Sequence, residues 1–80
     1  YIISQHYREI AEAIMEQMGR GVTSIKARGM YSDQEKRMLF CVVSKKEIVR
    51  LKEIVAEFDS SAFVIVSDAR EVFGEGFIEY

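Results

Sequence analysis

Hydrophobic residues near the N-terminus recur at the spacing of a helix. Ile10, Ile14 and Met18 share one helical face, and Ser4 stands in front of them as a candidate N-cap. The pattern predicts a short strand up to Ser4, followed by a helix that ends at about Met18. Gly19 comes next, and glycine commonly ends a helix.

The hydrophobic period changes to two after this glycine. Thr23, Ile25 and Ala27 alternate with mostly polar neighbours, which predicts a half-exposed strand. Residues 31–35 are polar and turn-prone, and residues 36–43 form a dense run of β-forming side chains. We therefore expect these two strands to form a hairpin.

A second helix is predicted after the hairpin. Ser44 and Glu47 match a capping box. The apolar positions that follow share one helical face: Ile48, Leu51, Val55 and Phe58. Residues 62–66 then form an apolar run with the length of a strand. Residues 68–71 repeat the capping-box pattern, so we expect a short C-terminal turn that Gly74 ends.

The predicted elements follow the order βαββαβ. Right-handed crossovers then give an α+β, ferredoxin-like (split βαβ) domain over residues 1–80, with an antiparallel sheet and two helices on one face. The last two strands read as apolar on both sides, so the uncovered face is expected to carry an apolar patch. We assign this candidate interface to Met38, Phe40, Val42, Val64 and Val66. It favours a homo-oligomer over contact with another part of the parent protein, and it leaves dimer and trimer open.

Composition and charge limit the partners of this domain. Apolar residues make up 49% and charged residues 30%, the balance of a folded soluble module without a membrane span. The net charge of −2 comes from interspersed signs, which disfavours nucleic acid and lipid headgroups. The single Cys41 suits a buried position in a reducing compartment such as the cytoplasm. Because Tyr1 already reads as part of a strand, we expect the chain to be excised from a longer protein.

The sequence offers little for catalysis. His6 is the only histidine and Cys41 is far from it in sequence, so there is no ligand set for zinc and no nucleophile–base pair. Acidic residues such as Asp33 and Asp59 fall in turns, where short acids make local hydrogen bonds. We expect no enzyme, no metal and no cofactor.

Two glycine pairs define a candidate ligand site. Arg20 offers a planar fork of donors, and glycine lets an anion approach backbone N–H groups. We assign a small-anion or nucleotide site to Arg20, Gly21, Val22, Thr23, Gly74, Glu75, Gly76 and Phe77. The alternative is that both pairs are helix caps, with Arg20 lying over a sheet edge and Thr23 filling a strand. Since the strands concerned are expected at opposite edges, a shared site would form between neighbouring subunits.

Two functions found on this topology are disfavoured. Acylphosphatases hold phosphate with an arginine after the first strand, whereas Arg20 follows the first helix. RNA-recognition motifs need a glycine-flanked aromatic pattern on the third strand, and residues 37–42 lack it.

Several separated motifs, in order, cover nearly the whole chain. They are residues 10–14 (IAEAI), 19–23 (GRGVT), 29–31 (GMY), 42–44 (VVS), 59–64 (DSSAFV) and 71–77 (EVFGEGF). This set resembles the C-terminal soluble domain of YitT-type bacterial membrane proteins. The resemblance implies a cytosolic module attached after several membrane-spanning helices, with a fold similar to PII-like and CutA-like proteins. Those proteins assemble into oligomers, and PII proteins bind nucleotides, but the resemblance carries over no binding residue.

The sequence thus leaves two functions open. The first is a regulatory, ligand-sensing module of a membrane protein, on the cytoplasmic face of the bacterial inner membrane, that changes its assembly when a small anion binds. The alternative is a passive oligomerisation or docking module without a ligand.

Overall fold

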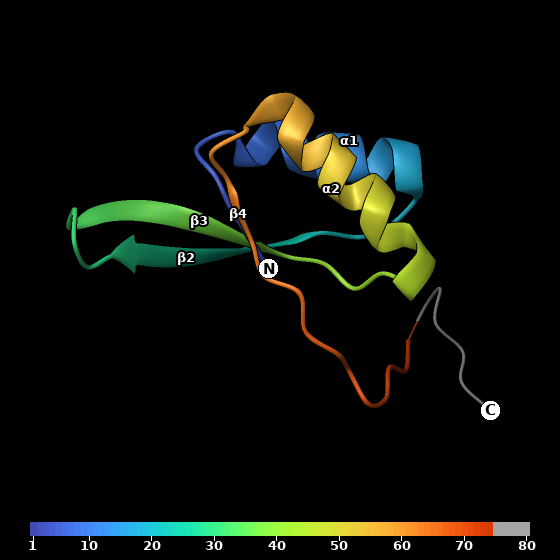
Figure 1. Cartoon of the computed structure of the whole chain (residues 1–80). Coiled ribbons are helices and arrows are strands. Elements are labelled where there is room, and N and C mark those ends of the chain that lie inside the picture. The colour runs from blue at the N-terminus through green and yellow to red at the C-terminus, as the bar shows by residue number, and fades with distance from the viewer. Residues whose placement is uncertain (75–80) are drawn as a thin grey trace.

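The structure, a computed structural model, describes residues 1–74 of the chain (Figure 1). Its elements are β1 (Ile2–Ile3), α1 (Tyr7–Met18), β2 (Thr23–Gly29), β3 (Gln34–Phe40), the 3-10 turn η1 (Lys45–Glu47), α2 (Ile48–Phe58) and β4 (Phe63–Val64). The predicted order βαββαβ is confirmed.

The four strands form one antiparallel sheet in the order β2-β3-β1-β4. This order results when each helix carries the chain across a neighbouring strand, and it is that of a ferredoxin-like sheet. The predicted fold is therefore confirmed. As expected, β2 and β4 lie at opposite edges. The short central strand β1 sets the register on both sides, because Ile2 lies opposite Leu39 of β3 and Val64 of β4.

The hydrophobic core lies between one face of the sheet and the two helices, which pack side by side above it (Figure 1). Ile2 and Leu39 point from the sheet into this core, and each is only 1% exposed. The helices contribute the remaining buried apolar side chains: Ile10, Ala13, Ile14, Leu51, Ile54 and Val55. These helical positions are spaced by three and four residues, as an amphipathic helix requires.

The β2–β3 hairpin extends well past the body of the domain (Figure 1). Its register runs from Thr23 opposite Phe40 to Gly29 opposite Gln34, whereas β1 contacts only residues 38 and 39 of β3. The far half of the hairpin is therefore not flanked by another strand on the β3 side. Its tip carries two strongly exposed apolar residues, Met30 (88%) and Tyr31.

A buried serine connects the two ends of the helical layer. Sequence analysis places Ser4 as the N-cap of α1, but the helix begins at Tyr7 and His6 holds the cap position. Ser4 Oγ instead accepts the His6 backbone N–H at 2.9 Å and donates to Asp59 Oδ2 at 2.6 Å. Asp59 is the residue that ends α2. The Ser4 hydroxyl thus joins the segment that leads into α1 to the segment that follows α2.

Three predicted elements differ from the structure. The strand predicted over residues 36–43 is observed as β3 over Gln34–Phe40, so residues 41–43 lie outside it. The strand predicted over residues 62–66 is shorter, since β4 spans only Phe63 and Val64, although Ile65 still exchanges backbone hydrogen bonds with Tyr1. The helical turn predicted over residues 68–71 is wrong, because residues 65–73 contain no helix or strand. A capping-box pattern stabilises a helix only where an amphipathic run long enough to pack follows it, and here the run is too short.

Candidate functional site

Arg20, the central residue of the predicted ligand site, is held by a glutamate. It lies between α1 and β2, and its guanidinium contacts Glu47 at the start of α2. Nε and Nη2 donate to Glu47 Oε1 at 3.1 and 3.0 Å. Both side chains are less than a quarter exposed. The guanidinium fork that we assigned to an anionic ligand therefore binds a carboxylate of the chain itself.

Glu47 serves the arginine and the helix at once. The predicted capping box with Ser44 is confirmed, and Glu47 Oε1 accepts the Ser44 backbone N–H at 2.7 Å. That backbone N–H, followed by the Arg20 guanidinium, lowers the pKa of Glu47 from 4.5 to about 2. The Glu47 carboxylate therefore links the start of α2 to Arg20 in the α1–β2 connection.

The first glycine pair divides into one helix cap and one connecting residue. Gly19 ends α1 with a left-handed backbone (φ 66°), and its N–H donates to Met15 O at 3.1 Å. The cap interpretation is thus correct for Gly19. Nothing lies within 4 Å of a side chain built at Gly21, Val22 packs against the core, and Thr23 opens β2 opposite Phe40.

The second glycine pair is described only in part. Gly74 has a positive φ of 151°, and Glu75, Gly76 and Phe77 lie outside the described residues. The convergence of the two pairs stays a prediction.

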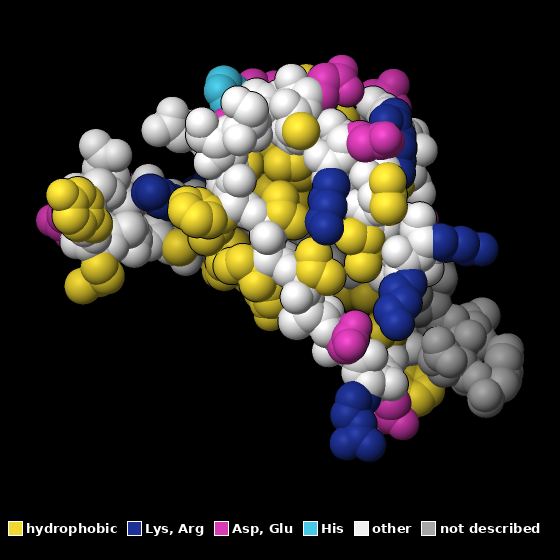
Figure 2. All heavy atoms as spheres, viewed as in Figure 1, with side chains coloured by type: hydrophobic (Ala, Val, Ile, Leu, Met, Phe, Trp, Pro, Cys, Tyr) yellow, Lys and Arg dark blue, Asp and Glu magenta, His cyan; other side chains and the backbone are white. Residues whose placement is uncertain are grey.

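The face of the sheet that the helices leave open carries an apolar patch, which we call the open-face patch. Its members point away from the helices and are Tyr1, Ile3, Ile25, Met38, Phe40, Phe63 and Ile65. The Tyr1 and Phe40 rings contact each other, with centroids 5.1 Å apart. Figure 2 shows hydrophobic side chains gathered where the hairpin joins the body, away from the helices.

The predicted interface residues divide between this patch and other places. Met38 and Phe40 belong to the open-face patch, but Val64 was assigned to the wrong face. It lies opposite the buried Ile2 and packs against the core. Both faces of β4 are apolar, so hydrophobicity alone could not set its orientation. The sequence pattern did not assign Phe63 to this interface. The register of β4 with β1 does, because it places Phe63 opposite Ile3.

Val42 and Val66 lie beyond the ends of β3 and β4. They line a hollow of about 760 Å³ whose walls include residues 40–45 and 65–69. Cys41 also lines it, and burial raises the pKa of its thiol. This hollow is mainly apolar and brings no cluster of charged groups together.

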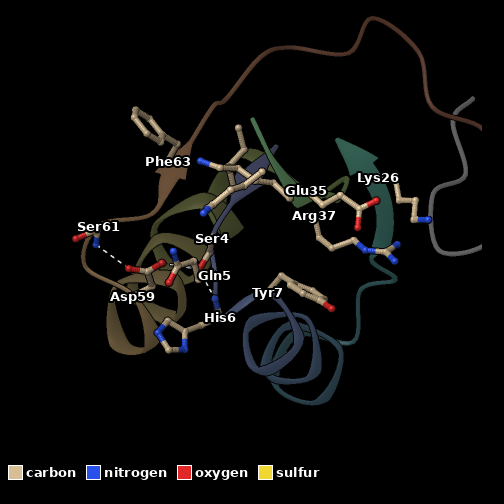
Figure 3. Close-up of a pocket in the computed structure, with 13 residues that line it drawn as sticks. Ser4, Gln5, His6, Tyr7, Lys26, Glu35, Arg37, Asp59, Ser61 and Phe63 are labelled. Carbon is tan, nitrogen blue, oxygen red and sulfur yellow. Dashed lines mark hydrogen bonds between the residues drawn. The ribbon is translucent and has the colours of Figure 1, made fainter. Parts of the chain in front are cut away.

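A second, more polar groove lies between the hairpin and the N-terminal end of α1, with a volume of about 680 Å³ (Figure 3). Asp59 stands at one end of it, and its carboxylate accepts the Ser61 backbone N–H at 2.9 Å in addition to the Ser4 hydroxyl. These two hydrogen bonds, that of Ser4 first, lower the pKa of Asp59. No local sequence pattern predicts this groove, because its walls come from segments far apart in the chain.

Comparisons with known proteins agree with the resemblance inferred from the motifs. Residues 20–74 match the family described as "Uncharacterized protein conserved in bacteria (DUF2179)". The chain is 49% identical over 76 residues to the UPF0750 membrane protein YvjA of Bacillus subtilis, covering 95% of this chain and 27% of YvjA. It is 34% identical over 73 residues to the UPF0750 membrane protein YitT of the same organism, covering 91% of this chain and 26% of YitT. The predicted resemblance to YitT-type proteins is confirmed.

A solved structure is also similar. The crystal structure of an uncharacterized DUF2179 protein from Eubacterium ventriosum aligns with a TM-score of 0.72 and 33% identity, over 82% of this chain and 90% of that one. That solved chain is therefore little larger than the region that it shares with this chain. In this chain, no helix among residues 1–74 has the length and apolar character needed to cross a membrane.

Proposed function

This chain belongs to the DUF2179 family, and we propose that it is the assembly domain of a bacterial membrane protein, joining copies of that protein through the open-face patch. Its relatives YvjA and YitT are membrane proteins about four times as long as the matched region. We infer that residues 1–80 form one domain and that the membrane-spanning part of the protein lies outside them. The unpaired Cys41 supports a position on the cytoplasmic side of the membrane.

The observation that carries this proposal is the exposure of large apolar side chains on one sheet face. Phe63 is 69% exposed, Ile65 50% and Phe40 38%, and all three lie on the side that the helices leave bare. Fully burying one such side chain is worth about 1.5–3 kcal/mol. A face of several such residues therefore favours association strongly.

A second copy of the chain is the occupant that we propose for this face. All residues of the patch are apolar, so two copies related by a twofold axis that bring their patches together would place apolar side chains against each other. The role is then structural and not enzymatic. Assembly of this kind agrees with the oligomers that the resemblance to PII-like and CutA-like proteins implies.

Regulation by an anionic ligand is the second candidate function. Arg20 is engaged by Glu47, but a different observation favours an anion site: the polar groove between the hairpin and α1 contains Lys26 and Arg37. In this case the domain senses a ligand and passes the signal to the membrane part through its assembly.

The assembly proposal is tested with the isolated 80-residue chain by analytical ultracentrifugation. We expect an oligomer for the unmodified chain and a folded monomer for Phe40→Glu, because the new carboxylate would be buried unpaired in the interface. Met30→Glu is the matched control, since Met30 is exposed at the hairpin tip, away from the body of the sheet. A monomeric unmodified chain at high concentration, or an oligomer that Phe40→Glu leaves intact, overturns the proposal.

A further inference from the structure

The polar groove has two walls of different origin. The hairpin supplies Lys26, Glu35 and Arg37 on one side, and Tyr7, the first residue of α1, lies across from Arg37 on the other (Figure 3). Its volume of about 680 Å³ lies within the range of sites that bind small molecules. The N-terminal end of α1 adds the positive end of a helix dipole to this space.

Two cations stand side by side in the hairpin wall. Lys26 and Arg37 are direct partners across the β2–β3 ladder. Both point to the helix side of the sheet, because Ser24, two residues before Lys26, lies opposite the buried Leu39. Like charges placed directly opposite each other destabilise a sheet, so this pair has an electrostatic cost.

No ion pair within residues 1–74 offsets that cost. Within residues 1–74, neither Lys26 nor Arg37 makes an ion pair or a side-chain hydrogen bond. Glu35 lies on the same wall but is exposed and stays beyond ion-pair distance of both. Asp59 already accepts the Ser4 hydroxyl and the Ser61 N–H. Arg37 is half-buried, which weakens screening of its charge by water.

We propose that this groove binds a small dianionic molecule, with its charged oxygen atoms between Lys26 and Arg37. The Arg37 guanidinium provides a planar fork for two oxygens, and Lys26 provides a compact second charge. A phosphate monoester and a dicarboxylate both present this chemistry. Tyr7 borders the groove on the helix side and would contact the uncharged part of the ligand. Lys26 and Arg37 project from the face of the sheet opposite the open-face patch, although Ile3 and Phe63 of that patch also line the groove.

The test is a titration of the isotope-labelled 80-residue chain, followed by backbone amide NMR at constant ionic strength. The probes are glycerol phosphate and succinate, which distinguish a phosphate monoester from a dicarboxylate. We expect saturable shifts at residues 5–7, 26 and 37 with at least one probe. Arg37→Gln and Lys26→Gln should each weaken that binding about tenfold or more, since each removes a charged hydrogen-bond partner.

Lys52→Gln is the matched control, because Lys52 is an exposed lysine of α2 that does not line the groove. It removes the same charge and should leave the dissociation constant unchanged. The proposal is overturned if neither probe produces saturable shifts, or if Lys52→Gln weakens binding as much as Arg37→Gln. Repeating the titration with Phe40→Glu separates this result from the assembly proposal, because the groove should bind equally well in a monomer.

Discussion

The Ser4 hydroxyl donates a 2.6 Å hydrogen bond to the Asp59 carboxylate, although 55 positions separate the two residues. This bond joins the segment that enters α1 to the segment that leaves α2. Together with the bond from the His6 N–H to Ser4 Oγ, it fixes the first helix and the last strand relative to each other.

We predict that Ser4→Ala raises the pKa of Asp59 toward its ordinary value of 3.8, because the Ser4 hydroxyl is the main cause of the lowering. A carboxylate with a lowered pKa adds stability above pH 3.8, and the protein loses that stability as the pH falls through the folded-state pKa. Ser4→Ala should therefore lose less stability on acidification. NMR titration of the Asp59 carboxyl carbon measures the shift, and exposed Ser60→Ala should leave it unchanged.

We predict that Glu47 makes the domain acid-sensitive. Its pKa is lowered from 4.5 to about 2, so its stabilising effect is complete above pH 4.5 and is lost as the pH falls toward 2. Urea unfolding at several pH values should show this loss in the unmodified chain and a smaller one in Glu47→Gln. The exposed Glu53→Gln is the control, and an acid loss equal in both variants would contradict the assignment.

Arg20 is predicted to act through stability. Arg20→Ala should lower the free energy of unfolding by about 1 kcal/mol, at the upper end of the range for ion pairs near the surface. Arg20→Lys should recover only part of this, because an ammonium group cannot reproduce the two contacts that Nε and Nη2 make with Glu47. Chemical denaturation of the three chains checks the order, and an unchanged free energy in Arg20→Ala would remove the structural role.

Two adjacent residues of β3 should respond differently to truncation. Leu39 is 1% exposed in the core, so Leu39→Ala should cost about 2–5 kcal/mol of unfolding free energy. Phe40 is 38% exposed on the other face, so Phe40→Ala should cost about 1 kcal/mol in a monomer and mainly weaken association. Denaturation at low protein concentration, combined with sedimentation, separates the two effects. Equal losses at both positions would mean that the sheet is covered on both faces.

The two glycines of the first pair are predicted to differ. Gly19 has a φ of 66°, so Gly19→Ala should cost about 1–2 kcal/mol through backbone strain. Gly21 has no positive φ and no atom within 4 Å of the added methyl group, so Gly21→Ala should stay within about 0.5 kcal/mol. Thermal and urea unfolding of both variants check this, and a large loss at Gly21 would indicate that its backbone has a role beyond connecting α1 to β2.

Features that depend on local sequence were predictable. The capping box of Ser44 and Glu47 and the apolar face of α2 are encoded within a few residues, and both are present. The βαββαβ order follows from the same kind of local pattern. The helix cap at Gly19 was predictable too, because a glycine directly after an amphipathic helix commonly ends it.

Features that depend on register or on distant partners were not predictable. The orientation of β4 is decided by the pairing of Val64 with Ile2, and a strand that is apolar on both sides gives no sign of it. The partner of Arg20 lies 27 positions away, so an isolated arginine between glycines looked like an anion-binding group. Lys26 and Arg37 become neighbours only through the hairpin register.

The position of β1 has a consequence for the order in which the domain folds. β1 is two residues long and central, and it pairs with residues near position 39 and near position 64. Closing these chain loops costs more entropy than forming the hairpin, in which strands adjacent in sequence pair. The hairpin can therefore form early, while the sheet as a whole closes only after residues 63 and 64 have been synthesised. During translation the N-terminal strand has no permanent neighbour on one side until nearly the whole domain has left the ribosome.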